Sequence, residues 1–168
     1  MKNINLKCIW ALLFVLICSL GVASATESAQ DPDKNTDDTP IEKLIKEYAD
    51  VKGSRDFIAS GGQMILARSL IRRTNLAPVA SEVDVLEVLK MQNVAPDKLQ
   101  EFEKDLKAAL ASYEYYGKAD SKNGKVDVYL TRDKSGIVDE LVIYNPQTQT
   151  LNSLKGSISP STLESIKQ

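Results

Sequence analysis

Histidine is absent from this sequence of 168 residues, and cysteine occurs only twice, at Cys8 and Cys18. Without imidazole, the chain lacks both the most frequent general base of nucleophilic catalysis and the commonest metal ligand. A charge surplus is also lacking, because 21 basic side chains stand against 23 acidic ones. Strong binding to nucleic acid requires a basic surplus that neutralises phosphates, so we expect no nucleic-acid partner.

The first 25 residues have the pattern of a secretory signal peptide. Two lysines, Lys2 and Lys7, introduce an apolar run over residues 8–20, and no acidic residue occurs in this part of the chain. Ala23-Ser24-Ala25 then provides the small residues that a signal peptidase accepts. We therefore predict a signal peptide at 1–25, cleavage after Ala25, and a periplasmic or secreted protein.

Two alternatives to this cleavage remain open. The run over residues 8–20 could be an uncleaved anchor, although it is shorter than the roughly 20 residues that span a bilayer. Lipid attachment at Cys18 would require a small residue before it, where the sequence has the bulky Ile17. Cleavage removes both cysteines, so the secreted form is expected to have no disulfide, no cysteine metal site and no stable membrane insertion.

Residues 26–40 form an acidic segment that differs in composition from the rest. They contain five acidic residues and one lysine among serines, threonines and prolines, without apolar periodicity. This composition is typical of a flexible linker. The linker divides the leader from a single expected domain at 41–168.

Helix signals come early in this domain and hairpin signals come late. Thr39-Pro40-Ile41-Glu42 is a capping box with proline at the first helical position, and Asn123-Gly124 is a strong hairpin turn. The order predicts an α+β fold, with a mostly antiparallel sheet, helices packed on one face, a β-meander and a short C-terminal helix. Helices are expected from Thr39, over 62–73, from Pro96 and after Ser159, and strands over 55–59, 83–89, 112–118, 126–131, 137–144 and 150–157.

Three of these elements carry finer predictions. The strand 83–89 is apolar on both faces and is expected to be central. Leu163 and Ile166 of the last helix are expected to face inward. In the helix over 62–73, helical spacing predicts an inward stripe of Met64, Ile65, Ala67, Leu70 and Ile71.

The order of the pieces resembles the Domain of Unknown Function 4252 family, small exported proteins of Gram-negative bacteria of the gut and mouth. The resemblance covers roughly residues 41–166, and the pair Gly61-Gly62 departs from it. It implies export, an α+β fold and no assigned activity. Some members are encoded beside extracytoplasmic-function sigma factors, which suggests a link to envelope stress signalling. The matching segments are Tyr48-Ala49-Asp50, Val83 to Val88, Tyr113-Glu114, Lys125-Val126, Glu140-Leu141-Val142 and Leu154 to Ser159.

Tyrosines on neighbouring predicted strands make the preferred candidate binding surface. Tyr113 and Tyr115 share one face of their strand, and Tyr129 and Tyr144 follow on the next strands. Such aromatic rings can recognise a glycan or a peptide. The alternative is structural, with each ring partly in the core and its hydroxyl in water.

Three arginines of the second helix form a second candidate surface. Arg68, Arg72 and Arg73 lie on one side of that helix and could bind an acidic partner or a phosphate group. The alternative is a solvated face in which they pair with nearby acids such as Asp56.

Carboxylates provide the remaining candidate chemistry. Asp127 and Asp139 could meet across a hairpin and serve in acid–base catalysis. Oxygen-bearing residues from Asp31 to Glu42 have the spacing of a calcium loop, but Thr36 replaces the required glycine and the helix cap competes for Glu42. We therefore predict no metal site.

Together these features favour an exported, non-enzymatic envelope protein that binds an unknown protein or small ligand. No cofactor is expected. The alternative is a periplasmic hydrolase that uses carboxylates alone.

Overall fold

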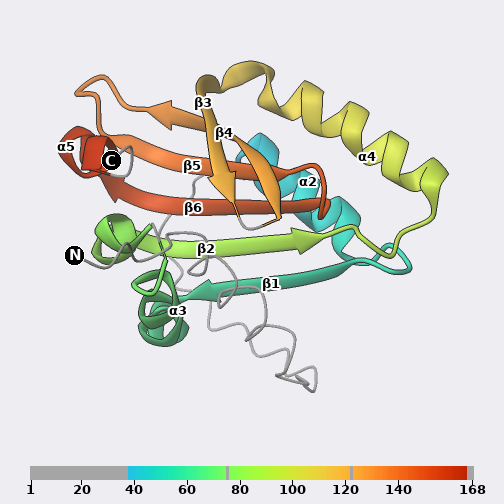
Figure 1. Cartoon of the computed structure of the whole chain (residues 1–168), viewed down its shortest axis with the longest axis horizontal. Helices are drawn as coiled ribbons and strands as arrows, with labels where there is room; N and C mark the ends of the chain where they lie inside the picture. Colours follow the sequence, from blue (N-terminus) through green and yellow to red (C-terminus); the bar gives the residue numbers. More distant parts are fainter. Residues whose placement is uncertain (1–37, 75, 122, 166–168) are drawn as a thin grey trace, which may run out of the picture.

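The computed structural model describes residues 38–165, apart from residues 75 and 122 (Figure 1). The predicted leader and most of the predicted linker therefore lie outside the described residues, as does Ile166. No helix in the described part of the chain is long and apolar enough to cross a membrane. The helices are α2 (Pro40–Ala49), η2 (Gly61–Gln63), α3 (Met64–Ile71), η3 (Ala77–Ser81), α4 (Pro96–Ala109), η4 (Leu110–Ser112) and α5 (Pro160–Ser165), where η marks 3₁₀ turns.

The strands form one six-stranded antiparallel sheet in the order β1-β2-β6-β5-β4-β3. The four strands from β3 to β6 make the predicted meander, and the α+β class is confirmed. Strand β2 lies between β1 and β6, which confirms its central position. The strand bounds are β1 (Arg55–Ser60), β2 (Val83–Lys90), β3 (Glu114–Ser121), β4 (Gly124–Arg132), β5 (Val138–Asn145) and β6 (Thr150–Ile158).

One face of the sheet is covered by the two longer helices, α2 and α4. The capping box forms as predicted, because Thr39 N donates to Glu42 Oε2 at 2.7 Å and Glu42 N donates to Thr39 Oγ1 at 3.2 Å. The buried stripe of α2 and Phe102 of α4 pack on alternate strand residues such as Leu89 and Val142. The rings of Phe102 and Tyr48 pack in a T-shaped arrangement, with their centroids 5.2 Å apart.

The opposite face has its own hydrophobic cluster, to which the short helices contribute. Met64, Ala67 and Ile71 of α3 and Leu163 of α5 pack there with Leu141 and the other alternate strand residues. The helices therefore do not all lie on one face, which corrects that part of the expectation. The physical reason is that β2, β5 and β6 are apolar on both faces, so each face requires a cover.

The position of α3 also differs from the sequence prediction. Residues Gly61–Gln63 form a 3₁₀ turn, and the α-helix begins only at Met64. Ile65 was expected in the core, but it is 72% exposed, and Leu66 beside it is 74% exposed. A helix of eight residues packs through one narrow stripe, here Met64, Ala67 and Ile71, and the neighbouring positions turn outward.

The hairpin between β3 and β4 forms at the predicted turn. Ser121 pairs with Gly124, whose φ of 106° lies in the left-handed region that glycine adopts without strain. Figure 1 shows this hairpin turned steeply away from the direction of the other strands. A register shift between Tyr115 and Gly117 accompanies this turn. The hairpin therefore places its residues beside α4.

Candidate functional site

An open groove of about 440 Å³ lies between α4 with its following turn and strands β4 and β5. This volume falls in the range of ligand sites in proteins. Its lining combines apolar residues with three charged side chains and with two tyrosines that come from the strands. The lining residues are Glu103, Leu106, Lys107, Leu110, Ala111, Asp127, Tyr129, Tyr144 and Pro146.

Two of the predicted tyrosines, Tyr129 and Tyr144, line this groove directly, and a third, Tyr115, extends its aromatic wall. Tyr115 pairs with Tyr129 in the sheet register, and their ring centres lie 5.2 Å apart. The hydroxyl of Tyr115 donates to Asp127 Oδ1 at 3.3 Å, and half of the residue remains exposed. The structure thus brings these three tyrosines together from three consecutive strands.

Tyr113, the fourth predicted tyrosine, has a different role. It is buried, and its hydroxyl donates to Glu140 Oε2 at 2.5 Å. Burial and the negative charge of Glu140 raise the pKa of the Tyr113 hydroxyl. Tyr113 therefore belongs to the core beneath α2 and is unavailable to a ligand in the groove.

Tyr144 contributes a buried hydroxyl to the wall of the groove. Its hydroxyl oxygen is buried and makes no hydrogen bond of acceptable geometry within the described residues. Burial, followed by the negative charge of Glu103, raises the pKa of Tyr144 to about 12. A buried polar group without a partner is uncommon in native proteins. The Tyr144 hydroxyl is therefore part of the closed wall of the groove beside Glu103, and its ring is the part that lines the groove.

Charges of both signs surround the tyrosines. Glu103 and Lys107 project from α4, one helical turn apart, and Asp127 projects from β4. The Asp127 carboxylate lies 3.6 Å from Lys118 Nζ of β3. The groove therefore offers donors and acceptors without a strong net charge.

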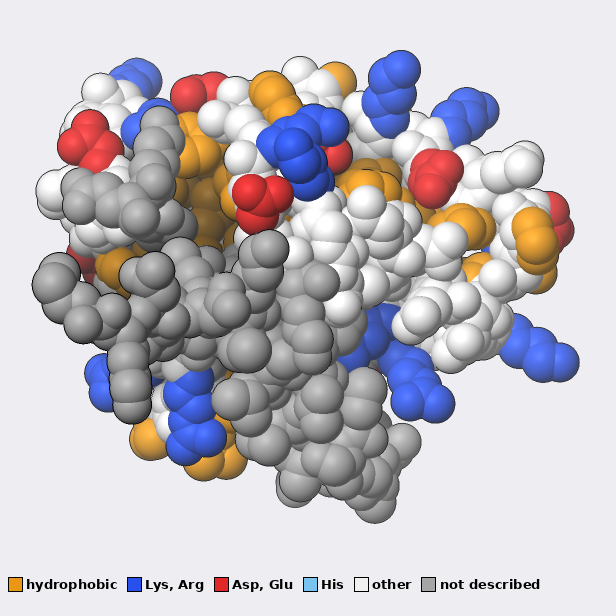
Figure 2. Space-filling view, viewed as in Figure 1, with side chains coloured by type: hydrophobic (Ala, Val, Ile, Leu, Met, Phe, Trp, Pro, Cys, Tyr) orange, Lys and Arg blue, Asp and Glu red, His pale blue; other side chains and the backbone are white. Residues whose placement is uncertain are grey.

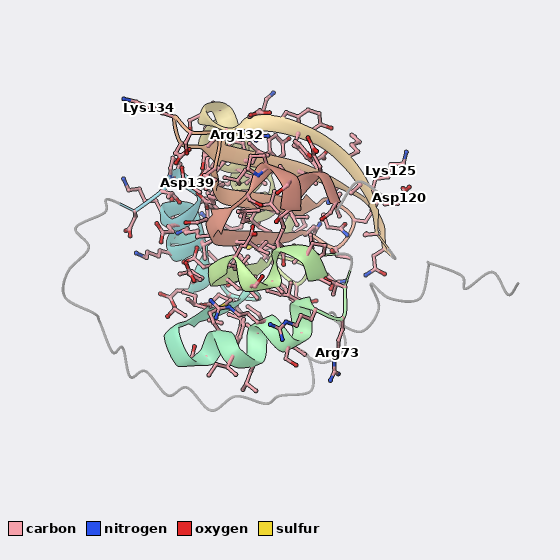
Figure 3. All side chains as sticks on the ribbon, turned by 90° about the vertical axis from the view of Figure 1, so that its left-hand side faces the viewer. Arg73, Asp120, Lys125, Arg132, Lys134 and Asp139 are labelled. Carbon is pink, nitrogen blue, oxygen red and sulfur yellow. The ribbon has the colours of Figure 1, made fainter. Side chains whose placement is uncertain are left out.

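The predicted arginines lie elsewhere, on the side of the sheet that α3 covers. Arg68 donates from Nε and Nη2 to the carbonyl of Val83 and forms an ion pair with Asp84 at 3.0 Å. It thus pairs with an acid of β2. Arg72 and Arg73 are exposed, and Figure 3 shows Arg73 pointing away from the body of the protein. The structure does not bring the arginines and the tyrosines into one site.

The carboxylates predicted to meet across a hairpin, Asp127 and Asp139, do not meet. In the β4–β5 register Asp127 is opposite Tyr144, whereas Asp139 lies beside the register shift at the other end. Figure 3 shows Asp139 near Arg132 at one end of the hairpin, and Lys125, two residues before Asp127, at the other end. The carboxylate that shares the groove with Asp127 is Glu103.

The sequence contained only a partial signal for the helical wall. Glu103 and Lys107 are each one residue after the buried pair Phe102 and Leu106, so they border the apolar stripe of α4. Such border positions are candidates for a groove rim. Which strands they face depends on how α4 crosses the sheet, and no local pattern indicates that.

A second group of polar residues is buried between α2 and the sheet. Lys155 of β6 forms an ion pair with Glu42 of α2 and lies 3.7 Å from Glu87 Oε2 of β2. Burial raises the pKa of the Glu87 carboxyl, and Lys155 opposes this shift. Nearby, Ser153 donates to Glu140 at 2.6 Å. These residues fix α2 on the sheet and are not among those that line the groove beside α4.

The calcium-loop pattern of the sequence runs from Asp31 to Glu42. Its last residues include Thr39 and Glu42, which form the cap of α2. Its residues up to 37 lie outside the described part of the chain.

Comparison with known proteins gives one match. The model of the family DUF4252, a domain of unknown function, matches residues 62–166. No curated protein and no solved structure matches the chain. The match includes α4 and all strands of the groove, and it starts after β1.

Proposed function

The chain belongs to the DUF4252 family, a domain of unknown function, and from this premise we propose that it is an exported, non-enzymatic protein that binds a sugar-like ligand in the groove beside α4. The observation that carries the proposal is that Tyr129 and Tyr144 line one open groove and that the exposed ring of Tyr115 packs beside Tyr129. Export is proposed from the leader pattern of residues 1–25. A connection to envelope stress signalling is part of the proposal through the family resemblance alone.

The composition of the groove favours a neutral, polyhydroxylated ligand. Aromatic rings bury the apolar face of a pyranose ring, and ionised side chains form strong hydrogen bonds with its hydroxyls. Asp127 and Glu103 can accept such bonds, and Lys107 can donate them. A strongly charged ligand is favoured less, because the lining residues carry both signs.

Binding of disaccharides, measured by saturation-transfer NMR and calorimetry, tests this proposal. The probes are maltose, cellobiose and N,N′-diacetylchitobiose, which differ in linkage and substituents. We expect at least one to bind, and we expect Tyr129→Ala to weaken binding about tenfold, since a stacked ring contributes about 1 kcal/mol or more.

Two glutamates on α4 provide a matched control. Glu103→Gln changes a lining residue and is expected to weaken binding several-fold, because hydrogen bonds to a charged group are the stronger ones. Glu101→Gln removes the same charge from an exposed position that pairs with Lys98. It is expected to bind as the wild type does. Absence of binding to all three sugars, or equal binding by Tyr129→Ala, would contradict the proposal.

One observation favours the hydrolase alternative as a second candidate. Glu103 and Asp127 are two carboxylates that line the same groove, and glycoside hydrolysis uses such a pair. Release of nitrophenol from nitrophenyl glycosides, with Asp127→Asn as the inactive control, tests this candidate. Turnover that Asp127→Asn abolishes would replace the binding function by a catalytic one.

A further inference from the structure

Helix α3 presents two large aliphatic side chains to solvent at one tip of the molecule. Ile65 and Leu66 are 72% and 74% exposed, more than the other large hydrophobic residues of the described chain. The 3₁₀ turn that precedes them, Gly61–Gln63, is exposed throughout. Two adjacent aliphatic side chains with this exposure form a small apolar patch on the surface.

Positive charge follows at the C-terminal end of α3. Ile65 and Leu66 lie in the first turn of α3, whereas Arg72 is the C-cap of this helix and Arg73 follows in the turn after it; all four residues are exposed. Ser69 lies between them and is also exposed. Figure 2 shows basic side chains beside exposed hydrophobic ones at the lower left, where α3 lies in Figure 1.

The charge of this segment is unusual for the chain. Residues 61–74 contain three arginines and no acidic residue, although the chain as a whole has slightly more acids than bases. Arg68 is paired with Asp84 of β2 and holds α3 against that strand. Arg72 and Arg73 are left exposed for an outside partner.

The kind of partner follows from size and charge. A stable protein interface buries about 800 Å² on each side, far more than the two exposed aliphatic side chains of this tip provide. A second copy of the chain would also place the arginines of both copies against each other. A lipid surface, by contrast, requires only a few apolar side chains at the depth of the acyl boundary and cations at the depth of the phosphates.

We propose that the outward face of α3 docks this protein on an anionic lipid surface, with Ile65 and Leu66 entering the headgroup region and Arg72 and Arg73 binding lipid phosphates. The helix lies flat on the membrane, and no part of the described chain crosses it. The association is weak and reversible, because two aliphatic side chains bury less apolar surface in the membrane than one acyl chain does.

Cosedimentation with lipid vesicles tests the proposal. The protein is produced from its full reading frame, and its N-terminus is determined by mass spectrometry. The vesicles are phosphatidylcholine alone or phosphatidylcholine with one-third phosphatidylglycerol. We expect binding to the anionic vesicles, weakened by salt. We expect Ile65→Ser with Leu66→Ser to lower the partition coefficient by about a hundredfold if both side chains are fully buried, because each buried aliphatic contributes roughly a factor of ten.

The charged residues have a matched control on the other face of the sheet. Arg72→Gln with Arg73→Gln is expected to weaken anionic-vesicle binding by about tenfold or more. Lys43→Gln with Lys104→Gln removes the same two charges from exposed positions of α2 and α4 and is expected to change it less than twofold. All variants share one N-terminus, so a retained leader affects them equally. Melting curves check that each variant is folded.

Three results would overturn the proposal. The first is that the wild type does not bind anionic vesicles, and the second is that the serine variant binds them as well as the wild type does. The third is that the lysine control loses as much binding as the arginine variant, which would show attraction by overall charge. A concentration-dependent dimer in sedimentation that the serine variant abolishes would assign this face to a second copy instead.

Discussion

Replacement of Lys155 by methionine removes the cation that lies among the buried carboxylates beneath α2. Its ammonium forms an ion pair with Glu42 and lies 3.7 Å from Glu87 Oε2, and these side chains are 16%, 22% and 6% exposed. Methionine has a similar length and no charge, so the packing volume is kept. The variant therefore tests the charge of Lys155 rather than its size.

The expected loss of stability follows from the geometry. At an effective dielectric constant of about 20, one ion pair at 3.7 Å contributes about 4 kcal/mol of attraction. The attraction between Lys155 and Glu42 adds to this value. Part of the total is offset, because the variant no longer has the desolvation cost of a buried ammonium group. Removal of one partner from a buried pair costs about 3–5 kcal/mol, since it leaves a buried charge without compensation. We expect Lys155→Met to lower the free energy of unfolding by this amount at neutral pH.

Urea denaturation followed by circular dichroism measures the change. With a slope of about 2 kcal/mol per molar urea, the midpoint falls by roughly 1.5–2.5 M. Glu101→Met, at an exposed position of α4, is the control and should shift the midpoint little. A Lys155→Met midpoint within about 0.3 M of the wild type, at an unchanged slope, would refute the reasoning.

Three further predictions concern single side chains. Burial raises the pKa of Glu87 above its ordinary value of 4.5. The protonated carboxyl therefore favours the folded state: its contribution to stability is complete below pH 4.5 and is lost as the pH rises through the pKa of the folded protein. The stability of Glu87→Gln relative to wild type should therefore increase as pH rises from about 4 to 8, and a difference that stays constant in urea titrations would contradict this. Tyr144→Phe removes a buried hydroxyl without a hydrogen-bond partner, so the variant should be as stable as the wild type or more stable by up to about 1 kcal/mol. A loss of more than about 1 kcal/mol in urea denaturation would mean that this hydroxyl makes a hydrogen bond in the folded protein. Gly156→Ala places a methyl group against the backbone carbonyl of Glu82 and should lower the free energy of unfolding by about 1–3 kcal/mol. Gly62→Ala is the control, because its methyl group enters open space. Equal melting temperatures of the two variants would contradict the expected clash.

Local signals in the sequence were sufficient for most of the secondary structure. Helix α2 begins where the capping box places it, because Thr39 and Glu42 satisfy the first backbone amides of the helix by themselves. The β3–β4 hairpin closes at the predicted Asn123-Gly124, where Gly124 opens β4 with a positive φ that glycine adopts without strain. The inward face of α3 was not predictable in the same way. Its phase is set by the 3₁₀ turn before it, and Ile65 satisfied the helical spacing as well as Met64 did.

The candidate groove was predictable only by half. Period-two alternation placed Tyr113 and Tyr115 on one face, and both do contribute to the side of the sheet that α2 and α4 cover. The two tyrosines differ in burial. Tyr113 lies under the start of α2 and donates a hydrogen bond to Glu140, whereas Tyr115 lies on β3, the edge strand of the sheet, and is half exposed. The helical wall with Glu103 arises from the crossing of α4 over the sheet, which is a tertiary feature.

The two proposed surfaces belong to opposite faces of the sheet, which leads to a last prediction. Tyr129 faces the groove, and the next residue, Leu130, packs on the other side in the cluster that includes Met64 and Ala67 of α3. Mutations at distant sites without shared partners act independently. Tyr129→Ala should therefore leave vesicle binding unchanged, and the serine variant at Ile65 and Leu66 should leave sugar binding unchanged. Both quantities come from the calorimetric and cosedimentation assays above. If either variant altered the other binding by more than about threefold, the sheet would transmit a signal between its faces, and the view of two separate surfaces would be wrong.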